Sequence, residues 1–107
     1  MILRTWRAFA DASSADHYPR HLLDTVRPEL EKIAGFRGLF LVTRRHGDEV
    51  EYVVQTLWDS MDAIRTFAGP HPERAVVEPA AAATLLRFDE MVDHYEVLAT
   101  TASIKRT

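Results

Sequence analysis

Two consecutive segments constrain the fold of this chain more than any other feature. FRGLFLVTRR (residues 36–45) and EVEYVVQTLW (residues 49–58) have the composition of strands, and the HGDE between them is typical of a hairpin turn. Alternation puts apolar side chains on both faces of each strand: Phe36, Phe40 and Val42 against Leu39 and Leu41, and Tyr52, Val54 and Trp58 against Val53 and Leu57. The sequence therefore predicts a hairpin whose two faces both need to be covered.

Periodicity and capping signals predict the other elements. Residues 2–9 alternate as a first strand, and residues 90–99 are expected to form the last one. A helix is expected to begin near Asp16, to be disturbed by Pro28 and to end at Gly35. The remaining segments are a second helix over residues 60–68 capped by Asp59 or Ser60, short helical pieces within residues 70–88, and a frayed tail over residues 100–107.

This order, strand–helix–strand–strand–helix–strand, is typical of the α+β ferredoxin-like fold, with a four-stranded antiparallel sheet. We expect a single domain over residues 1–99. Helices on one side of such a sheet cover one face only. The sheet of a second copy would cover the other face, so we predict a homodimer.

Composition narrows the functional classes. The chain has 107 residues and 47% hydrophobic content, which fits one domain with a real core. Its net charge of -3 gives no basic surface for nucleic acid, and the absence of cysteine excludes disulfides and thiolate chemistry. Arg4 and Arg7 interrupt the apolar N-terminal run, so we expect neither a signal peptide nor a membrane span, and a cytoplasmic protein.

Four segments, ADHYPRHLLDTVRPEL, GFRGLFLVTRR, LWDSMDAIRTFAG and VDHYEVL, resemble the antibiotic biosynthesis monooxygenase family, whose members form dimeric α+β barrels. The resemblance implies a ligand cavity between the sheet and the helices of each subunit. It also implies one of two chemistries, either cofactor-free oxygenation of polycyclic phenols to quinones or the binding and degradation of haem.

The haem-degrading branch of this family uses an asparagine on the first strand, a tryptophan that ends the third strand and a histidine on the following helix. Only Trp58 matches. The chain contains no asparagine, Ala68 stands at the histidine position, and His71 follows Gly69 and Pro70 in a different local setting. The resemblance therefore argues against haem degradation by that route and leaves haem binding through another histidine as a third option.

Several side chains are candidates for the cavity. Trp58 is either a wall of the pocket or ordinary core, and Tyr18 and Phe67 are expected to line the same space. His94 or His21 would supply the acid–base group, because histidine can take up a proton near neutral pH.

Charged candidates are fewer. Arg37 interrupts an apolar strand, so it either forms a salt bridge or holds an anionic group of the substrate, and Arg4 and Arg7 carry the same two interpretations. No metal site is expected. His17 and His21 have a chelating spacing but lie on different parts of the helix surface, and His94 with Glu96 lacks a third ligand.

The resemblance, together with these candidate residues, implies a dimeric, cofactor-independent monooxygenase-like protein that oxidises a small aromatic or polycyclic phenol. The alternative is a non-catalytic dimeric barrel that binds a small hydrophobic ligand.

Overall fold

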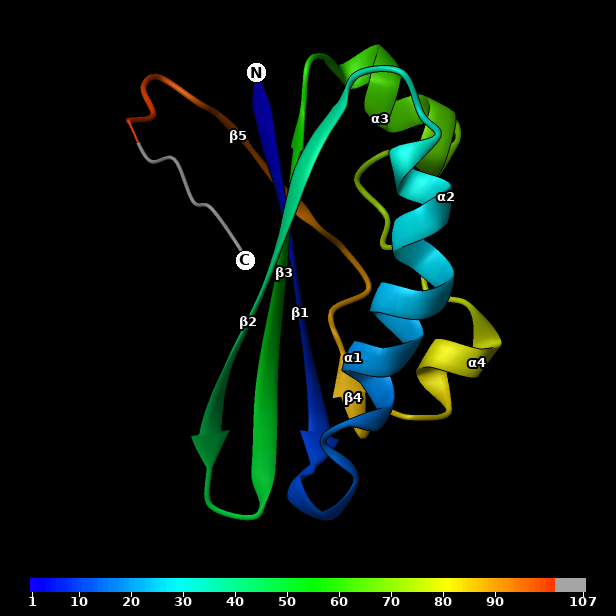
Figure 1. The fold of residues 1–107 in the computed structure, drawn as a ribbon, viewed down its shortest axis with the longest axis vertical. Helices are drawn as coiled ribbons and strands as arrows, with labels where there is room; N and C mark the ends of the chain where they lie inside the picture. The colour runs from blue at the N-terminus through cyan, green and yellow to red at the C-terminus, as the bar shows by residue number, and fades with distance from the viewer. Residues whose placement is uncertain (102–107) are drawn as a thin grey trace.

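The computed structural model describes residues 1–101, so the part of the predicted tail from residue 102 onward lies outside the described residues. Its centre is an antiparallel sheet with the order β2-β3-β1-β4, in which β5 also pairs with β1 (Figure 1). The strands are β1 (Ile2–Asp11), β2 (Phe36–His46), β3 (Glu49–Trp58), β4 (Arg87–Phe88) and β5 (Asp93–Glu96). All helices lie on one face of this sheet, as a ferredoxin-like α+β fold requires.

The last strand differs from the prediction for residues 90–99. It begins earlier, at Arg87, and is interrupted between β4 and β5. The interruption has a physical cause, because residues 90–92 pair with residues 73–75 instead of with β1, although the Asp89 N–H still donates to the Arg7 carbonyl of β1 (3.0 Å). The Trp6 indole donates to the Asp89 carbonyl (2.7 Å), and the backbone of Glu90 and Val92 pairs with residues 73–75.

The first helix runs without a break from α1 (His17–His21) through a π-helical segment (Leu22–Val26) into α2 (Arg27–Glu31). The disturbance predicted at Pro28 takes the form of this π segment. Pro28 has no N–H to donate, and the Arg27 N–H bonds to the carbonyl of Leu22, five residues back, instead of four. None of the helices within residues 1–101 is long and apolar enough to cross a membrane.

The second helix, α3 (Met61–Ala68), begins at Ser60, whose side chain accepts from the Ala63 N–H (3.2 Å). Of the two predicted caps, Ser60 is therefore the one used. A short 3-10 turn (Ala12–Ser14) follows β1, and α4 (Pro79–Ala82) is the helical piece found within residues 70–88.

Phe36 lies on the opposite face of β2 from the one that simple alternation predicts. The register of β2 against β3 shifts between Phe36 and Gly38, where an extra residue forms a bulge. Phe36 therefore packs edge-on against Trp58 on the helical side, with ring centroids 5.2 Å apart. Phe40 and Val42 stay on the outer face.

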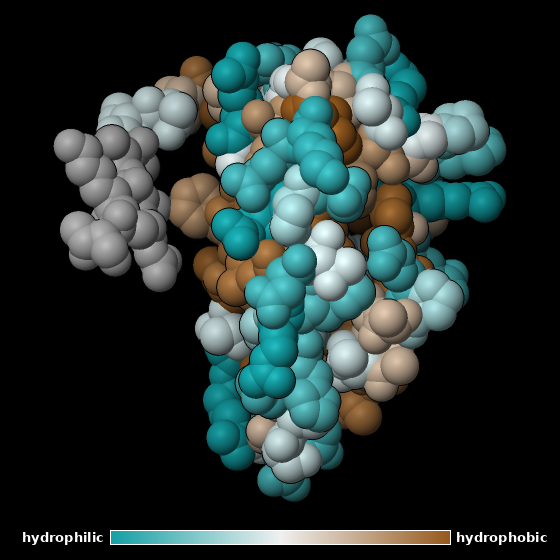
Figure 2. All heavy atoms as spheres, turned by 45° about the vertical axis from the view of Figure 1, so that its right-hand side comes forward, coloured by the Kyte–Doolittle hydropathy of each residue, from teal (hydrophilic) through white to brown (hydrophobic). Residues whose placement is uncertain are grey.

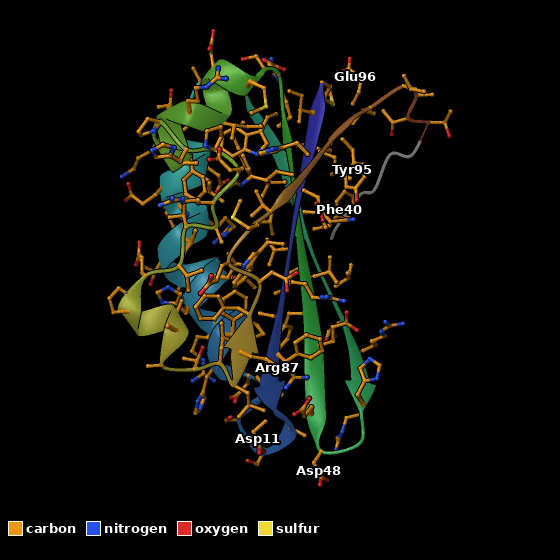
Figure 3. All side chains as sticks on the ribbon, turned by 180° about the vertical axis from the view of Figure 1, so that it is seen from behind. Asp11, Phe40, Asp48, Arg87, Tyr95 and Glu96 are labelled. Carbon is orange, nitrogen blue, oxygen red and sulfur yellow. The ribbon has the colours of Figure 1, made fainter. Side chains whose placement is uncertain are left out.

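The outer face of the sheet carries exposed apolar side chains. Phe40 is 38% exposed, Val42 46% and Tyr95 56%. Figure 3 shows Phe40 and Tyr95 projecting from the side of the sheet that faces away from the helices. The helical side that Figure 2 brings forward has hydrophilic side chains down its middle, with hydrophobic atoms to either side.

Candidate functional site

A cavity of about 80 Å³ lies between the sheet and the helices. Its sheet wall comes from neighbouring positions on the inner face of β1 and β3, where Arg4 pairs with Thr56 and Trp6 pairs with Val54. Strand alternation places these four side chains on one face, so the polar Arg4 and Thr56 and the apolar Trp6 and Val54 all point toward the helices.

The helical wall of the cavity is formed by the first helix. Tyr18, His21, Leu22, Val26 and Leu30 line the cavity. Tyr18 packs at 5.7 Å from the Trp6 ring, and its burial raises the pKa of its hydroxyl. The Tyr18 phenol is therefore neutral at physiological pH and can only donate or accept a hydrogen bond in that form.

The rim is formed by the segment that precedes and includes α4. Val76, Val77, Glu78 and Ala81 line the cavity, and Val76 is 44% exposed. Because Glu78 is also more than half exposed, this rim is where the cavity meets solvent.

Arg4 is the buried cation of the site. It is only 5% exposed and donates to the carbonyls of Pro72 and Arg74, the latter at 2.8 Å. Burial lowers the pKa of Arg4 to about 10, which still leaves the guanidinium charged at neutral pH. Its Cζ lies 6.0 Å from the ring centroid of Phe67, which also lines the cavity.

His94 does not line the cavity. Its Nε2 lies 2.9 Å from Nη1 of Arg4, across the pairing of β1 with β5. A guanidinium has only donors, so Nε2 accepts this hydrogen bond and the neutral imidazole carries its proton on Nδ1. Burial, followed by the charge of Arg4, lowers the pKa of His94. His94 therefore positions Arg4, and its Nε2 is not free to act as a base on a ligand.

His21 is the histidine that the structure brings to the cavity. Its side chain is 13% exposed, and its Nε2 is buried without a hydrogen-bond partner among the described residues. The nearest carboxylate oxygen is Oε2 of Glu78, at 3.9 Å, which is too long for a hydrogen bond. A buried polar nitrogen with no partner is uncommon, and here it sits in the wall of a cavity.

Trp58 lies one layer behind the cavity. It is fully buried, its ring stacks on Phe67 with centroids 5.9 Å apart, and its Nε1 donates to Oγ1 of Thr56 (2.8 Å). Phe67 and Thr56 both line the cavity, whereas Trp58 is not among the lining residues. Trp58 thus fixes two wall residues without reaching the space itself.

Arg37 is not brought to the cavity. It lies at the surface and forms two hydrogen bonds of 2.7 Å with the carboxylate of Asp59. The Arg37 contact lowers the pKa of Asp59. Of its two predicted roles, the geometry favours the salt bridge over an anchor for substrate charge, because a bidentate partner already occupies the guanidinium.

The cation of the site is Arg4, which the sequence had singled out only as one of three candidates. The sequence does contain an indication that Arg4 points to the inner side of the sheet, because strand alternation places it on the same face as the apolar Trp6 and Ala8. Thr56 and the rim at Val76–Glu78 were not predicted as site residues at all. No group of three or more potential metal ligands occurs within residues 1–101.

No family model matches the sequence, and neither does any curated protein. Solved structures do resemble it. A candidate antibiotic biosynthesis monooxygenase from Bacillus cereus is 16% identical, with a TM-score of 0.64 and 98% of each chain covered. The haem degrader MhuD from Mycobacterium tuberculosis, with two haems bound in its active site, is 19% identical, with a TM-score of 0.62 over 95% of this chain and 100% of its own.

A third structure is the monooxygenase of the Streptomyces coelicolor gene ActVA-Orf6, in complex with nanaomycin D. It is 14% identical, with a TM-score of 0.61 over 98% of this chain and 92% of its own. Identities this low establish the fold and leave activity open. The chain therefore has the ferredoxin-like fold that is found in antibiotic biosynthesis monooxygenases and in a haem degrader.

Proposed function

We propose that this protein is a member of the antibiotic biosynthesis monooxygenase family and oxidises a small phenol with molecular oxygen, without a cofactor. One observation carries the proposal: Arg4, a buried cation, and His21, a histidine with an unpartnered nitrogen, line the same largely apolar cavity. The Streptomyces coelicolor structure, a monooxygenase holding nanaomycin D, supports the choice of chemistry by likeness of fold.

The residues suggest a division of labour. His21 Nε2 would take the proton of the phenol hydroxyl, and the positive charge of Arg4 would attract an anionic group of the ligand. The electron-rich phenolate then reacts with oxygen. One oxygen atom enters the ring to give a quinone and the other leaves as water, so that the substrate itself supplies the electrons.

The cavity volume limits the substrate. Pockets that hold drug-sized ligands measure hundreds of Å³, and an apolar cavity of about 150 Å³ accommodates benzene. At about 80 Å³ this cavity is smaller than both, so a single aromatic ring would fit only with part of it extending to the exposed rim at Glu78. This small volume favours single-ring phenols over the polycyclic phenols and the haem that were considered from the sequence.

The proposal includes a homodimer formed through the outer face of the sheet. Phe40, Val42 and Tyr95 together expose apolar area on that face, and no element within residues 1–101 covers them. The sheet of a second copy would bury these side chains and leave the cavity on the helical side free.

Oxygen uptake with a panel of single-ring phenols, in the absence of any cofactor, tests the proposal. Replacing His21 with glutamine keeps a polar group of similar size but removes the base, so the rate should fall about 100-fold or more. His17→Gln is the matched control, since His17 is an exposed histidine on the same helix. Equal rates for the wild type and His21→Gln would refute the assignment of His21, and no uptake with any phenol would refute the oxygenase.

A further inference from the structure

Arg4 is buried without an acidic partner. No salt bridge to Arg4 exists among the described residues, and its depressed pKa is caused by burial alone. A buried guanidinium loses the solvation of its charge and ordinarily recovers it from a carboxylate. Within residues 1–101 the partners of Arg4 are two backbone carbonyls and the neutral His94, so no carboxylate there compensates its charge.

The hydrogen-bond capacity of Arg4 is also incomplete. A guanidinium has five N–H donors. Nη1 uses both of its donors on Pro72 and His94, and Nη2 uses one on Arg74. This leaves the Nε donor and one Nη2 donor without a partner among residues 1–101. Two donors on one planar cation match the two oxygens of a carboxylate, whereas a phenolate offers a single oxygen.

The opposite wall carries a different polar group. His21 belongs to the helix that packs over the sheet, so its open nitrogen and the guanidinium of Arg4 approach the cavity from different layers. The lining of the cavity also includes the aromatic side chains of Trp6, Tyr18 and Phe67. Glu78, the carboxylate of the lining, lies at the exposed rim next to His21 and not beside Arg4.

From this arrangement we propose that the substrate is a single-ring aromatic acid with a phenolic hydroxyl, whose carboxylate binds Arg4 and whose hydroxyl faces His21. The inference rests on the proposed function, because it names the substrate class for the same cavity. It also gives Arg4 a role that differs from stabilising a phenolate, since the cation recognises a group that does not react.

Calorimetric titration with two probes of nearly equal shape tests the inference. Para-hydroxybenzoate carries the carboxylate, and para-hydroxybenzyl alcohol replaces it with a neutral group. The wild type should bind the acid at least about tenfold more tightly, as expected for charged hydrogen bonds in a buried site. Arg4→Met, which keeps the length of the side chain, should abolish the preference.

Arg7→Met is the matched control, because Arg7 stands on the same strand but on the outer face, where it is half exposed. It should retain the full preference. Equal affinity of the wild type for the two probes would overturn the inference, and so would a preference that survives in folded Arg4→Met. If Arg4→Met does not fold, the comparison of the two probes on the wild type decides alone.

The two proposals fail in different ways. Tight binding of para-hydroxybenzoate, with no oxygen uptake for any phenol of the panel, would support the anion site and refute the oxygenase. Oxygen uptake with neutral phenols, at the same rate and affinity as with phenolic acids, would support the oxygenase and refute the anion site.

Discussion

At the scale of single residues, the contact between Arg4 and His94 links the cavity to the edge of the sheet. His94 accepts from Arg4 only while its imidazole is neutral, because a protonated ring has no acceptor and repels the guanidinium. The charges of Asp93 and Glu73 raise the pKa of His94, but the effects of burial and of Arg4 are larger and keep it below its ordinary value. The site therefore depends on a histidine that stays uncharged.

This contact predicts a pH dependence of stability. The folded-state pKa of His94 lies below the ordinary value of 6.5, so the unfolded chain binds the proton more readily. The free energy of unfolding should therefore fall as the pH drops below about 6.5 and level off below the folded pKa. Urea unfolding of the wild type and His94→Gln across this range measures the effect.

In His94→Gln the amide oxygen can still accept from Arg4 but does not titrate, so this part of the pH dependence should disappear. The carboxylates of Glu49, Glu51 and Asp59, whose pKa values are lowered by arginine partners, lose their contribution only at more acidic pH and serve as an internal reference in both proteins. Identical pH profiles for the two proteins would contradict this role of His94.

At the scale of elements, the entry to β2 and the start of α3 approach each other closely. Gly35 has φ +93, a conformation that L-residues with a side chain rarely adopt, and its carbonyl accepts from the Asp59 N–H (2.8 Å). A Cβ at Gly35 would lie 2.7 Å from the Cβ of Ala63, in the first turn of α3. Glycine is needed there for two separate reasons.

Gly35→Ala should therefore lower the free energy of unfolding by about 2 kcal/mol or more, from the unfavourable backbone conformation together with the steric clash. Gly69→Ala is the matched control, because Gly69 also has a positive φ (+81) but open space around it. Gly69→Ala should lower the free energy of unfolding by less than Gly35→Ala does, and the difference between the two values measures the steric clash. Equal losses in urea unfolding would show that the approach to Ala63 costs nothing.

Elements specified by local signals could be predicted from the sequence, and features that depend on distant partners could not. The first helix was expected to begin near Asp16 and to end at Gly35, both local signals, and the structure contains it over His17–Glu31. The interruption after Phe88 depends on hydrogen bonds to Trp6 and to residues 73–75, which no local pattern encodes. The interruption shortened the predicted last strand for that reason.

The same distinction explains the charged residues of the site. Arg4 and Arg37 are both cations in apolar strands, and the sequence alone does not separate them. The strand register decides which of the two lines the cavity. The bulge before Gly38 leaves Arg37 beside Asp59, whereas regular pairing puts Arg4 next to Thr56 on the inner face of the sheet. Assigning the cation correctly therefore required the tertiary structure.

At the scale of the whole molecule, the sheet separates two faces with different tasks. The inner face holds the cavity, and the outer face exposes Phe40, Val42 and Tyr95 beside an end rich in ion pairs, such as Arg87 with Glu49. In a two-fold symmetric dimer each residue of the interface occurs twice, so one unfavourable substitution acts twice.

Phe40→Asp should for this reason convert the proposed dimer into monomers, raising its dissociation constant by about 100-fold or more, because two carboxylates would be buried without partners. Analytical ultracentrifugation over a range of concentrations measures the change. Leu23→Asp is the matched control, since Leu23 is equally an exposed apolar residue (39%) but lies on the helical side. A wild type that sediments as a monomer, or a Phe40→Asp variant that remains dimeric, would show that the outer face serves another purpose.

If the dimer forms as proposed, binding of para-hydroxybenzoate should be unchanged in the Phe40→Asp monomer, because every residue assigned to the cavity comes from one chain.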